Sequence, residues 1–236
     1  MAQREALSQV RISVRNLVEF VMRSGDLDDR RMAGAKKEAM QAGSRLHRKI
    51  QRRMGSDYQA EVSLKHTVKE DSFELLIEGR ADGIITEPGG VTIDEIKCIY
   101  MDPGRLEEPD PVHMAQALCY GTIYAVHHDL EEIGIQLTYC NIETEEIRRF
   151  KEVKTREELE DWFKGLIHEY VKWARYLYHH RMRRQECLKT LQFPYAYREG
   201  QKELAACVYR SVAEGRNLYI QALPEWERRF LPYFPA

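Results

Sequence analysis

The chain has 236 residues, a formal net charge of −2 and 43% hydrophobic residues, enough for one large domain or one domain with an appendage. It contains no run of about 18 apolar residues and starts without a basic-then-apolar segment, which argues against a membrane span and a secretory signal. We therefore expect a cytoplasmic protein with no membrane partner. The five cysteines are isolated from one another, which argues against a disulfide framework and a zinc or iron–sulfur site.

The first half of the sequence predicts two helices followed by three strands. The helices are indicated by apolar residues repeating every three or four positions, at about 13–22 and 29–54. The strands are indicated by β-branched and aromatic residues, at about 60–68, 73–86 and 91–100.

The second half of the sequence predicts a helix, one more strand and a second helix. A proline-rich loop leads into a helix at about 112–127, and a fourth strand follows at about 134–142. Thr155 and Glu158 form a capping box that begins a long helix rich in aromatic residues. This order predicts an α/β fold with a mixed central β-sheet of about four strands flanked by helices.

The second and third predicted strands are joined by a strong turn signal, Glu87-Pro88-Gly89-Gly90. A hairpin folding symmetrically about this turn pairs residues whose numbers sum to 177. Asp82 would then lie opposite Glu95, and Arg80 opposite Lys97, with all four side chains on one face. Opposed Cβ atoms lie roughly 4.5–5.5 Å apart, so the two carboxylates would repel each other unless they share a divalent cation.

Four sequence elements occur in order on the expected helix and strand backgrounds: Gly43 to His47, Gly79 to Asp82, Glu95 to Lys97, and Gln116 to Tyr120. With them, residues 10 to 185 resemble the RecB-type branch of the PD-(D/E)XK nuclease superfamily, which includes CRISPR-associated exonucleases. The resemblance implies a restriction-endonuclease-like core with helical N-terminal and C-terminal extensions, and metal-dependent hydrolysis of phosphodiester bonds.

The resemblance also implies roles for individual residues. Asp82, Glu95 and Lys97 would be catalytic, and Mg²⁺ or Mn²⁺ would be held by Asp82, Glu95, the main-chain carbonyl of Ile96 and His47. The imidazole ligand favours Mn²⁺. Lys97 would orient or help deprotonate the attacking water. Relatives that hold an iron–sulfur cluster have a cysteine before the core, but here the first cysteine is Cys98, so no cluster is expected.

Four further residues are candidates for substrate binding. Gln116 and Tyr120 lie on one helix face, and Arg45 and Arg48 belong to a basic run beside His47 that approaching phosphates would meet first. Plain structural interpretations stay open for all of these: core packing for Tyr120 and His47, and a solvated helix face for the basic run.

Two other acidic residues near the predicted site are not assigned a catalytic role. Asp94, on the opposite strand face from Glu95, is interpreted as structural, and Glu61 only as a peripheral acid.

The C-terminal region, 191–236, is expected to form a helical extension to a nuclease domain of residues 1–190. Its segment Arg198-Glu199-Gly200-Gln201 resembles the start of DinG-type DNA helicases. No Gly-x-x-x-x-Gly-Lys-Ser/Thr motif occurs in the chain, so we expect no ATP cofactor. The alternative is that this region is only a packing extension.

The sequence thus predicts a metal-dependent DNA nuclease, an exonuclease acting on single-stranded DNA ends in repair or recombination, and the nuclease part of a nuclease–helicase or the partner of a helicase. One alternative is a catalytically inactive DNA-binding or helicase-interaction module. Another is a sequence-specific endonuclease, which shares the core but needs a base-reading element that the sequence does not indicate. Polarity, DNA against RNA, and one metal against two stay open.

Overall fold

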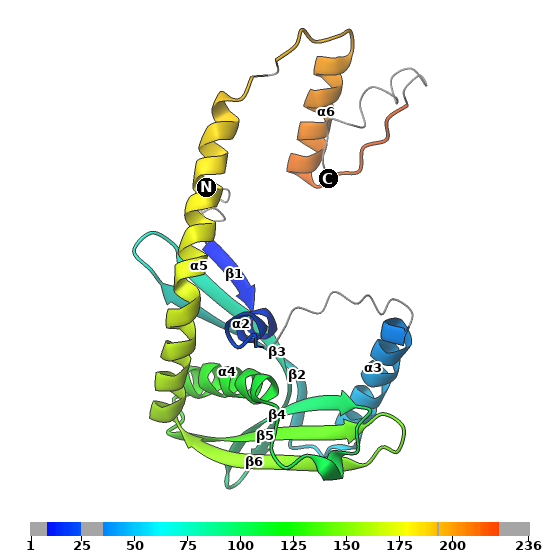
Figure 1. Ribbon diagram of the computed structural model, residues 1–236, viewed down its shortest axis with the longest axis vertical. Helices are drawn as coiled ribbons and strands as arrows, with labels where there is room; N and C mark the ends of the chain where they lie inside the picture. Colours follow the sequence, from blue (N-terminus) through cyan, green and yellow to red (C-terminus); the bar gives the residue numbers. More distant parts are fainter. Residues whose placement is uncertain (1–8, 25–34, 193, 222–236) are drawn as a thin grey trace. The chain divides into compact units, whose positions relative to one another are not determined.

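The computed structural model describes residues 9–24, 35–192 and 194–221, with the side chains of 35–40 left out of the description (Figure 1). The chain divides into two compact units, residues 1–186 and 187–236. In the described residues, no helix combines the length and the apolar character needed to cross a membrane.

The first unit is built on one mixed β-sheet. Its strand order is β1-β3-β4-β5-β6, and β2 pairs with β3 outside this path. The pairs β1–β3 and β4–β5 are parallel, and the other pairs are antiparallel. The strands are β1 (Gln9–Ser13), β2 (Tyr58–Lys69), β3 (Glu74–Glu87), β4 (Gly90–Ile99), β5 (Glu132–Asn141) and β6 (Ile147–Thr155).

The expected α/β fold is confirmed, because helices flank a central mixed sheet as in a restriction-endonuclease-like core. The expected number of about four strands is too low, because the described residues form a sheet of six strands. β1 has only five residues and leads directly into a helix, so its period is too short to recognise. β6 lies at the sheet edge and none of its residues is buried, so it lacks an apolar face.

The helices begin where side chains accept the free amides of their first turn. Ser13 accepts the amide of Asn16, and Asp110 accepts the amides of Val112 and His113. The predicted capping box is confirmed, since Glu158 accepts the Thr155 amide at 2.9 Å. The helices are α2 (Val14–Val21), α3 (Ala35–Arg53), α4 (Pro111–His128), α5 (Arg156–Thr190) and α6 (Gln201–Glu214). The first residues of the helix expected at 29–54 lie outside the described ones.

Two helices cover opposite faces of the central strands. α4 packs on the face of Ile93 and Ile135, within the main core that also includes α2 and the first half of α5. α3 packs on the other face, where its Leu46 and Ile50 form a smaller cluster with Ile96 and Cys140. The end of β4 therefore lies between α3 and α4, and the candidate site is found there.

Candidate active site

The β3–β4 hairpin has the predicted register, but its ladder ends just before the predicted carboxylate pair. Residues 83–87 pair with 90–94 so that each pair sums to 177, and the last pair is Gly83 with Asp94. Beyond it, the Asp82 carboxylate accepts the backbone amide of Ile96 at 2.8 Å. Because a side chain occupies this amide, the two strands separate there. Asp82 and Glu95 are therefore not paired across the ladder.

A cleft of about 1270 Å³ opens at this point, between α3 and α4. It brings together eight of the nine predicted site residues: His47, Arg48, Asp82, Glu95, Ile96, Lys97, Gln116 and Tyr120. The ninth, Arg45, lies with Arg48 in a neighbouring groove of about 390 Å³ whose lining is entirely basic. Arg48 lines both hollows, so the basic groove lies next to the cleft.

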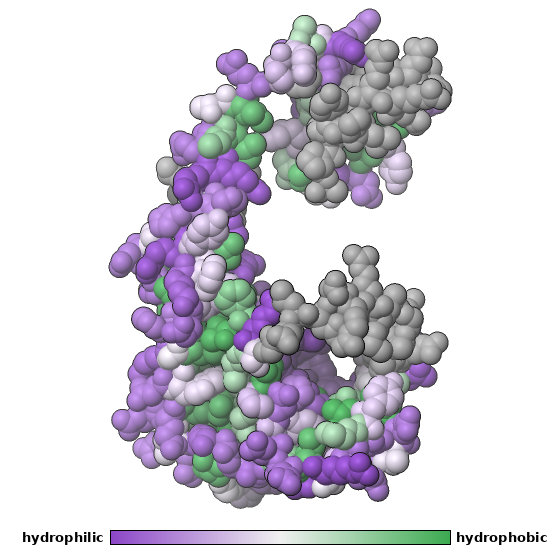
Figure 2. Space-filling view, in the orientation of Figure 1, coloured by the Kyte–Doolittle hydropathy of each residue, from purple (hydrophilic) through white to green (hydrophobic). Residues whose placement is uncertain are grey.

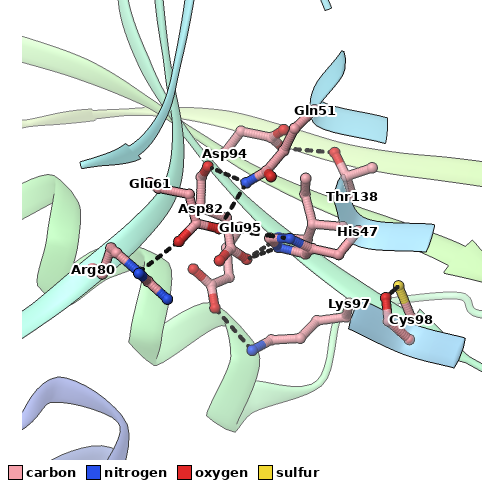
Figure 3. Close-up of polar contacts among 12 residues, drawn as sticks. His47, Gln51, Glu61, Arg80, Asp82, Asp94, Glu95, Lys97, Cys98 and Thr138 are labelled. Carbon is pink, nitrogen blue, oxygen red and sulfur yellow. Dashed lines mark hydrogen bonds and ion pairs between the residues drawn. The ribbon is translucent and has the colours of Figure 1, made fainter. Parts of the chain in front are cut away.

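His47 projects from α3 onto the acids of the adjacent strands (Figure 3). Its Nε2 lies 3.1 Å from Oδ2 of Asp82, and its Nδ1 lies 3.8 Å from Oε1 of Glu61. The hydrogen bond to Asp82 raises the pKa of His47. One ligand atom from each of these three residues lies within 4.8 Å of the others. This spacing and this donor set suit a divalent cation.

Glu61, which the sequence indicates only as a peripheral acid, lies among the candidate site residues of the cleft. β2 and β3 pair with residue numbers summing to 143, which puts Glu61 level with Asp82. The same hairpin argument, applied to the turn near Asp71, would have found it. Glu61 has a φ of 59°, a left-handed backbone conformation that residues other than glycine rarely adopt. Next to Glu61, the alternation of inward and outward side chains along β3 shifts by one residue. Ala81 and Ile84 are three positions apart and would face opposite sides of a regular strand, but both are buried in the main core.

The contacts of Glu61 correct one prediction. Its carboxylate accepts from Gln51 at 3.1 Å and pairs with Arg80 at 2.5 Å. Arg80 is therefore not opposite Lys97, although both line the cleft. The prediction assumed that the ladder continues to residue 80, and it ends at Gly83 instead.

Glu95 is the most unusual carboxylate of the site. It is only 5% exposed, and its Oε1 accepts from Nζ of Lys97 at 2.8 Å. Its Oε2 is buried and has no hydrogen-bond partner among the described residues. Burial, followed by the nearby charge of Asp82, raises the pKa of Glu95 to about 7. An orphaned carboxylate oxygen at this place fits a cation as its missing partner.

α4 supplies the opposite wall of the cleft. Gln116 accepts from Nζ of Lys97 at 2.6 Å, so it fixes the lysine beside Glu95. Tyr120 packs over Gly79, where an added Cβ would lie 2.8 Å from the tyrosine ring. Burial raises the pKa of Tyr120, so its hydroxyl stays protonated and able to donate. The glycine in the Gly79-to-Asp82 element thus has a structural cause.

Asp94 faces away from the cleft and has a full set of partners. It is completely buried, and its Oδ1 accepts from Thr138 at 2.6 Å and from Gln136 at 3.0 Å. The hydroxyl of Tyr58 lies 3.4 Å from its other oxygen. Burial raises the pKa of Asp94. Asp94 joins β2, β4 and β5, which agrees with its structural interpretation.

No family model matches the sequence, and no curated protein matches it. Solved structures do. The match to SSO0001 has 20% identity, a TM-score of 0.42, and covers 70% of this chain and 80% of that one. The match to the alkaline exonuclease LHK-Exo from Laribacter hongkongensis, in complex with dAMP, has 13% identity, a TM-score of 0.45, and covers 80% and 100%. A phage-related exonuclease from Haemophilus somnus matches at 16% identity with a TM-score of 0.34, covering 73% and 82%.

Proposed function

We propose that this protein is a metal-dependent DNA nuclease of the PD-(D/E)XK superfamily. The observation that supports it best is Glu95, a buried carboxylate that lines the polar cleft beside Asp82 and Lys97 and whose Oε2 has no hydrogen-bond partner among the described residues. A carboxylate kept only for stability would have its donors supplied by the protein, as Asp94 has.

The donor set of the cleft fits a hard divalent cation, Mg²⁺ or Mn²⁺. Asp82, Glu95 and the carbonyl of Ile96 would hold it, with His47 and Glu61 as further ligands. When bound, the cation supplies an activated water and neutralises charge that develops on the phosphate. The imidazole of His47 favours Mn²⁺ over Mg²⁺.

The remaining residues position the reactants. Lys97, held between Glu95 and Gln116, orients the attacking water and offsets charge on the phosphate in the transition state. The water oxygen bonds to phosphorus and gives up a proton to the solvent, the bond from phosphorus to the leaving oxygen breaks, and that oxygen takes up a proton. Tyr120 donates to the substrate, and Arg45 and Arg48 contact its phosphates.

The finer proposal is an exonuclease for single-stranded DNA ends that acts in repair or recombination. We assign the nuclease to residues 1–190 and a helicase-related extension to 191–236, so that a helicase, fused or separate, is the proposed partner. This assignment depends on the sequence resemblance of Arg198 to Gln201.

End-labelled single- and double-stranded DNA, incubated with Mn²⁺, with Mg²⁺ or with chelator, tests the proposal. We expect stepwise shortening of the single strand from one end, only with metal, and none with Lys97→Ala. The matched control is Lys65→Ala, because Lys65 is an exposed lysine of β2 outside the cleft. DNA that is bound but left uncut by the parent protein would instead support the inactive binding module.

A further inference from the structure

A second surface of the first unit has the properties of a site for unpaired bases. Exposed aromatic and aliphatic side chains of α2 and the middle of α5 lie together there. Figure 2 shows hydrophobic residues exposed among hydrophilic ones on the first unit. We call it the aromatic surface and define it by Phe20, Trp173, Tyr176 and Leu177, which are 45%, 48%, 57% and 45% exposed. The ring of Phe20 meets that of Trp173 edge to face, with centroids 5.7 Å apart.

The aromatic surface is the uncovered continuation of a buried stripe. Along α5, one line of residues is spaced alternately by four and three: Leu166, Tyr170, Trp173, Leu177, His180 and Arg184. The first two are buried in the core, with Phe20 packed on Tyr170. From Trp173 onward the line is exposed, and it changes from apolar to basic at His180 and Arg184.

This change of character indicates which partner fits. A second helix packing along α5 would need the apolar line to continue, but here it ends in an imidazole and a guanidinium. A single-stranded nucleic acid needs flat apolar rings for its bases and cations for its phosphates, in alternation. Trp173, Tyr176 and Phe20 supply the rings, and Arg184 and the exposed Arg23 at the end of α2 supply charge.

The aromatic surface is also connected to the cleft. Arg15 begins the exposed face of α2 and lines the cleft, and Phe20 lies five residues further along the same helix. Arg15 and Phe20 lie at opposite edges of the exposed face of α2, about 7.5 Å apart along the helix axis and about 140° apart around it. A strand that leaves the cleft and crosses this exposed face would bring bases some nucleotides beyond the bound phosphate over Phe20 and Trp173.

We propose that the aromatic surface stacks the bases of the single DNA strand whose phosphate occupies the cleft. This inference builds on the proposed function, because it names the substrate as an unpaired strand and gives the direction in which it leaves the site.

Fluorescence anisotropy of labelled oligo(dT), in chelator so that no cleavage occurs, tests the inference. We expect Trp173→Ala and Phe20→Ala each to weaken binding about tenfold, and Trp173→Phe to retain affinity within about twofold. The matched control is Tyr209→Ala, since Tyr209 is an exposed aromatic of the second unit, and it should bind like the parent.

An abasic deoxyribose–phosphate strand separates stacking from charge. The parent should bind it about tenfold more weakly than oligo(dT), and Trp173→Ala should lose that preference. Equal affinities of parent and Trp173→Ala for oligo(dT) would overturn the inference. So would a parent that sediments as a dimer and becomes monomeric with Trp173→Ala, because a second copy would then occupy the surface.

A different set of results would contradict the proposed nuclease function and not the aromatic surface. Asp82→Asn should abolish cleavage and leave the Trp173 effect on binding intact. A parent that never cuts DNA but still prefers oligo(dT) through Trp173 would contradict the proposed function and support the aromatic surface.

Discussion

Two neighbouring carboxylates of β4, Asp94 and Glu95, are buried on opposite faces of one sheet and differ in what completes them. Asp94 accepts from Thr138 and Gln136, so the protein alone satisfies it. Glu95 accepts from Lys97, and its other oxygen has no hydrogen-bond partner in the part of the chain that the structure describes. The comparison shows that burial of a charged side chain does not by itself indicate a functional group. A buried oxygen without a hydrogen-bond partner does indicate one, because the free-energy cost of removing that oxygen from water is offset only when a ligand binds.

The largest expected effect is on activity, through Glu95. Glu95→Gln keeps the shape of the side chain but removes its charge, so we expect DNA cleavage to fall about 10³-fold with no loss of folding. Initial rates on labelled oligonucleotide measure this. Glu87→Gln, an exposed glutamate at the end of β3, is the control and should cut at the parental rate. A Glu95→Gln variant of parental activity would remove Glu95 from the site.

The next largest effect is on stability, through Asp94. Asp94→Ala leaves the buried Thr138 hydroxyl without its acceptor and removes the shorter of the two hydrogen bonds that the Gln136 side chain donates, so the free energy of unfolding should fall by about 3 kcal/mol. Urea denaturation measures it, with Glu95→Gln as the contrasting variant. If Glu95→Gln lost as much stability as Asp94→Ala, the proposed division between the two faces of β4 would be wrong.

The pH dependence of stability should follow Glu95. Its pKa is raised from 4.5 to about 7 in the folded state, so the protonated form stabilises folding. This contribution is complete below pH 4.5 and is lost as the pH rises through 7. Without metal, Glu95→Gln should therefore be more stable than the parent by about 2 kcal/mol at pH 8, and less so at pH 5. A difference that does not change between these pH values would contradict the raised pKa.

Substitution of two glycines of β3 should have smaller effects that differ in kind, one on activity and the other on stability. An added Cβ at Gly79 meets the ring of Tyr120 in the cleft, whereas one at Gly83 would lie 1.9 Å from the Tyr58 hydroxyl behind Asp94. We expect Gly79→Ala to lower activity about tenfold while costing about 1 kcal/mol, because the ring is displaced from the cleft. Gly83→Ala should mainly lower stability, and cleavage per folded molecule should stay near the parental rate. Circular dichroism melts and cleavage rates together distinguish the two.

Local patterns in the sequence predicted much of the fold and of the site. The turn at Pro88 and Gly89 gave the correct register for residues 83–87, because a tight hairpin fixes pairing from its centre outward. The capping box at Thr155 was equally local. Both depend on residues close together in the chain.

The predictions fail where contacts between segments far apart in the sequence determine the structure. The strands separate at Asp82 because its side chain takes the amide of Ile96, and no strand periodicity reports that bond. The position of Glu61 beside Asp82 follows from the β2–β3 register, which the turn between β3 and β4 does not report. β1 and β6 were missed because each is short or exposed, and their pairing comes from the sheet as a whole.

Calorimetric titration of the metal-free protein with Mn²⁺ at pH 8 tests the central claim most directly. The account predicts that the parent binds Mn²⁺ and that Glu95→Gln binds it at least about tenfold more weakly. It also predicts that the parent loses affinity below pH 7, where Glu95 holds a proton that the metal must displace. A parent that takes up no Mn²⁺, or a Glu95→Gln variant that binds it equally well, would contradict the account.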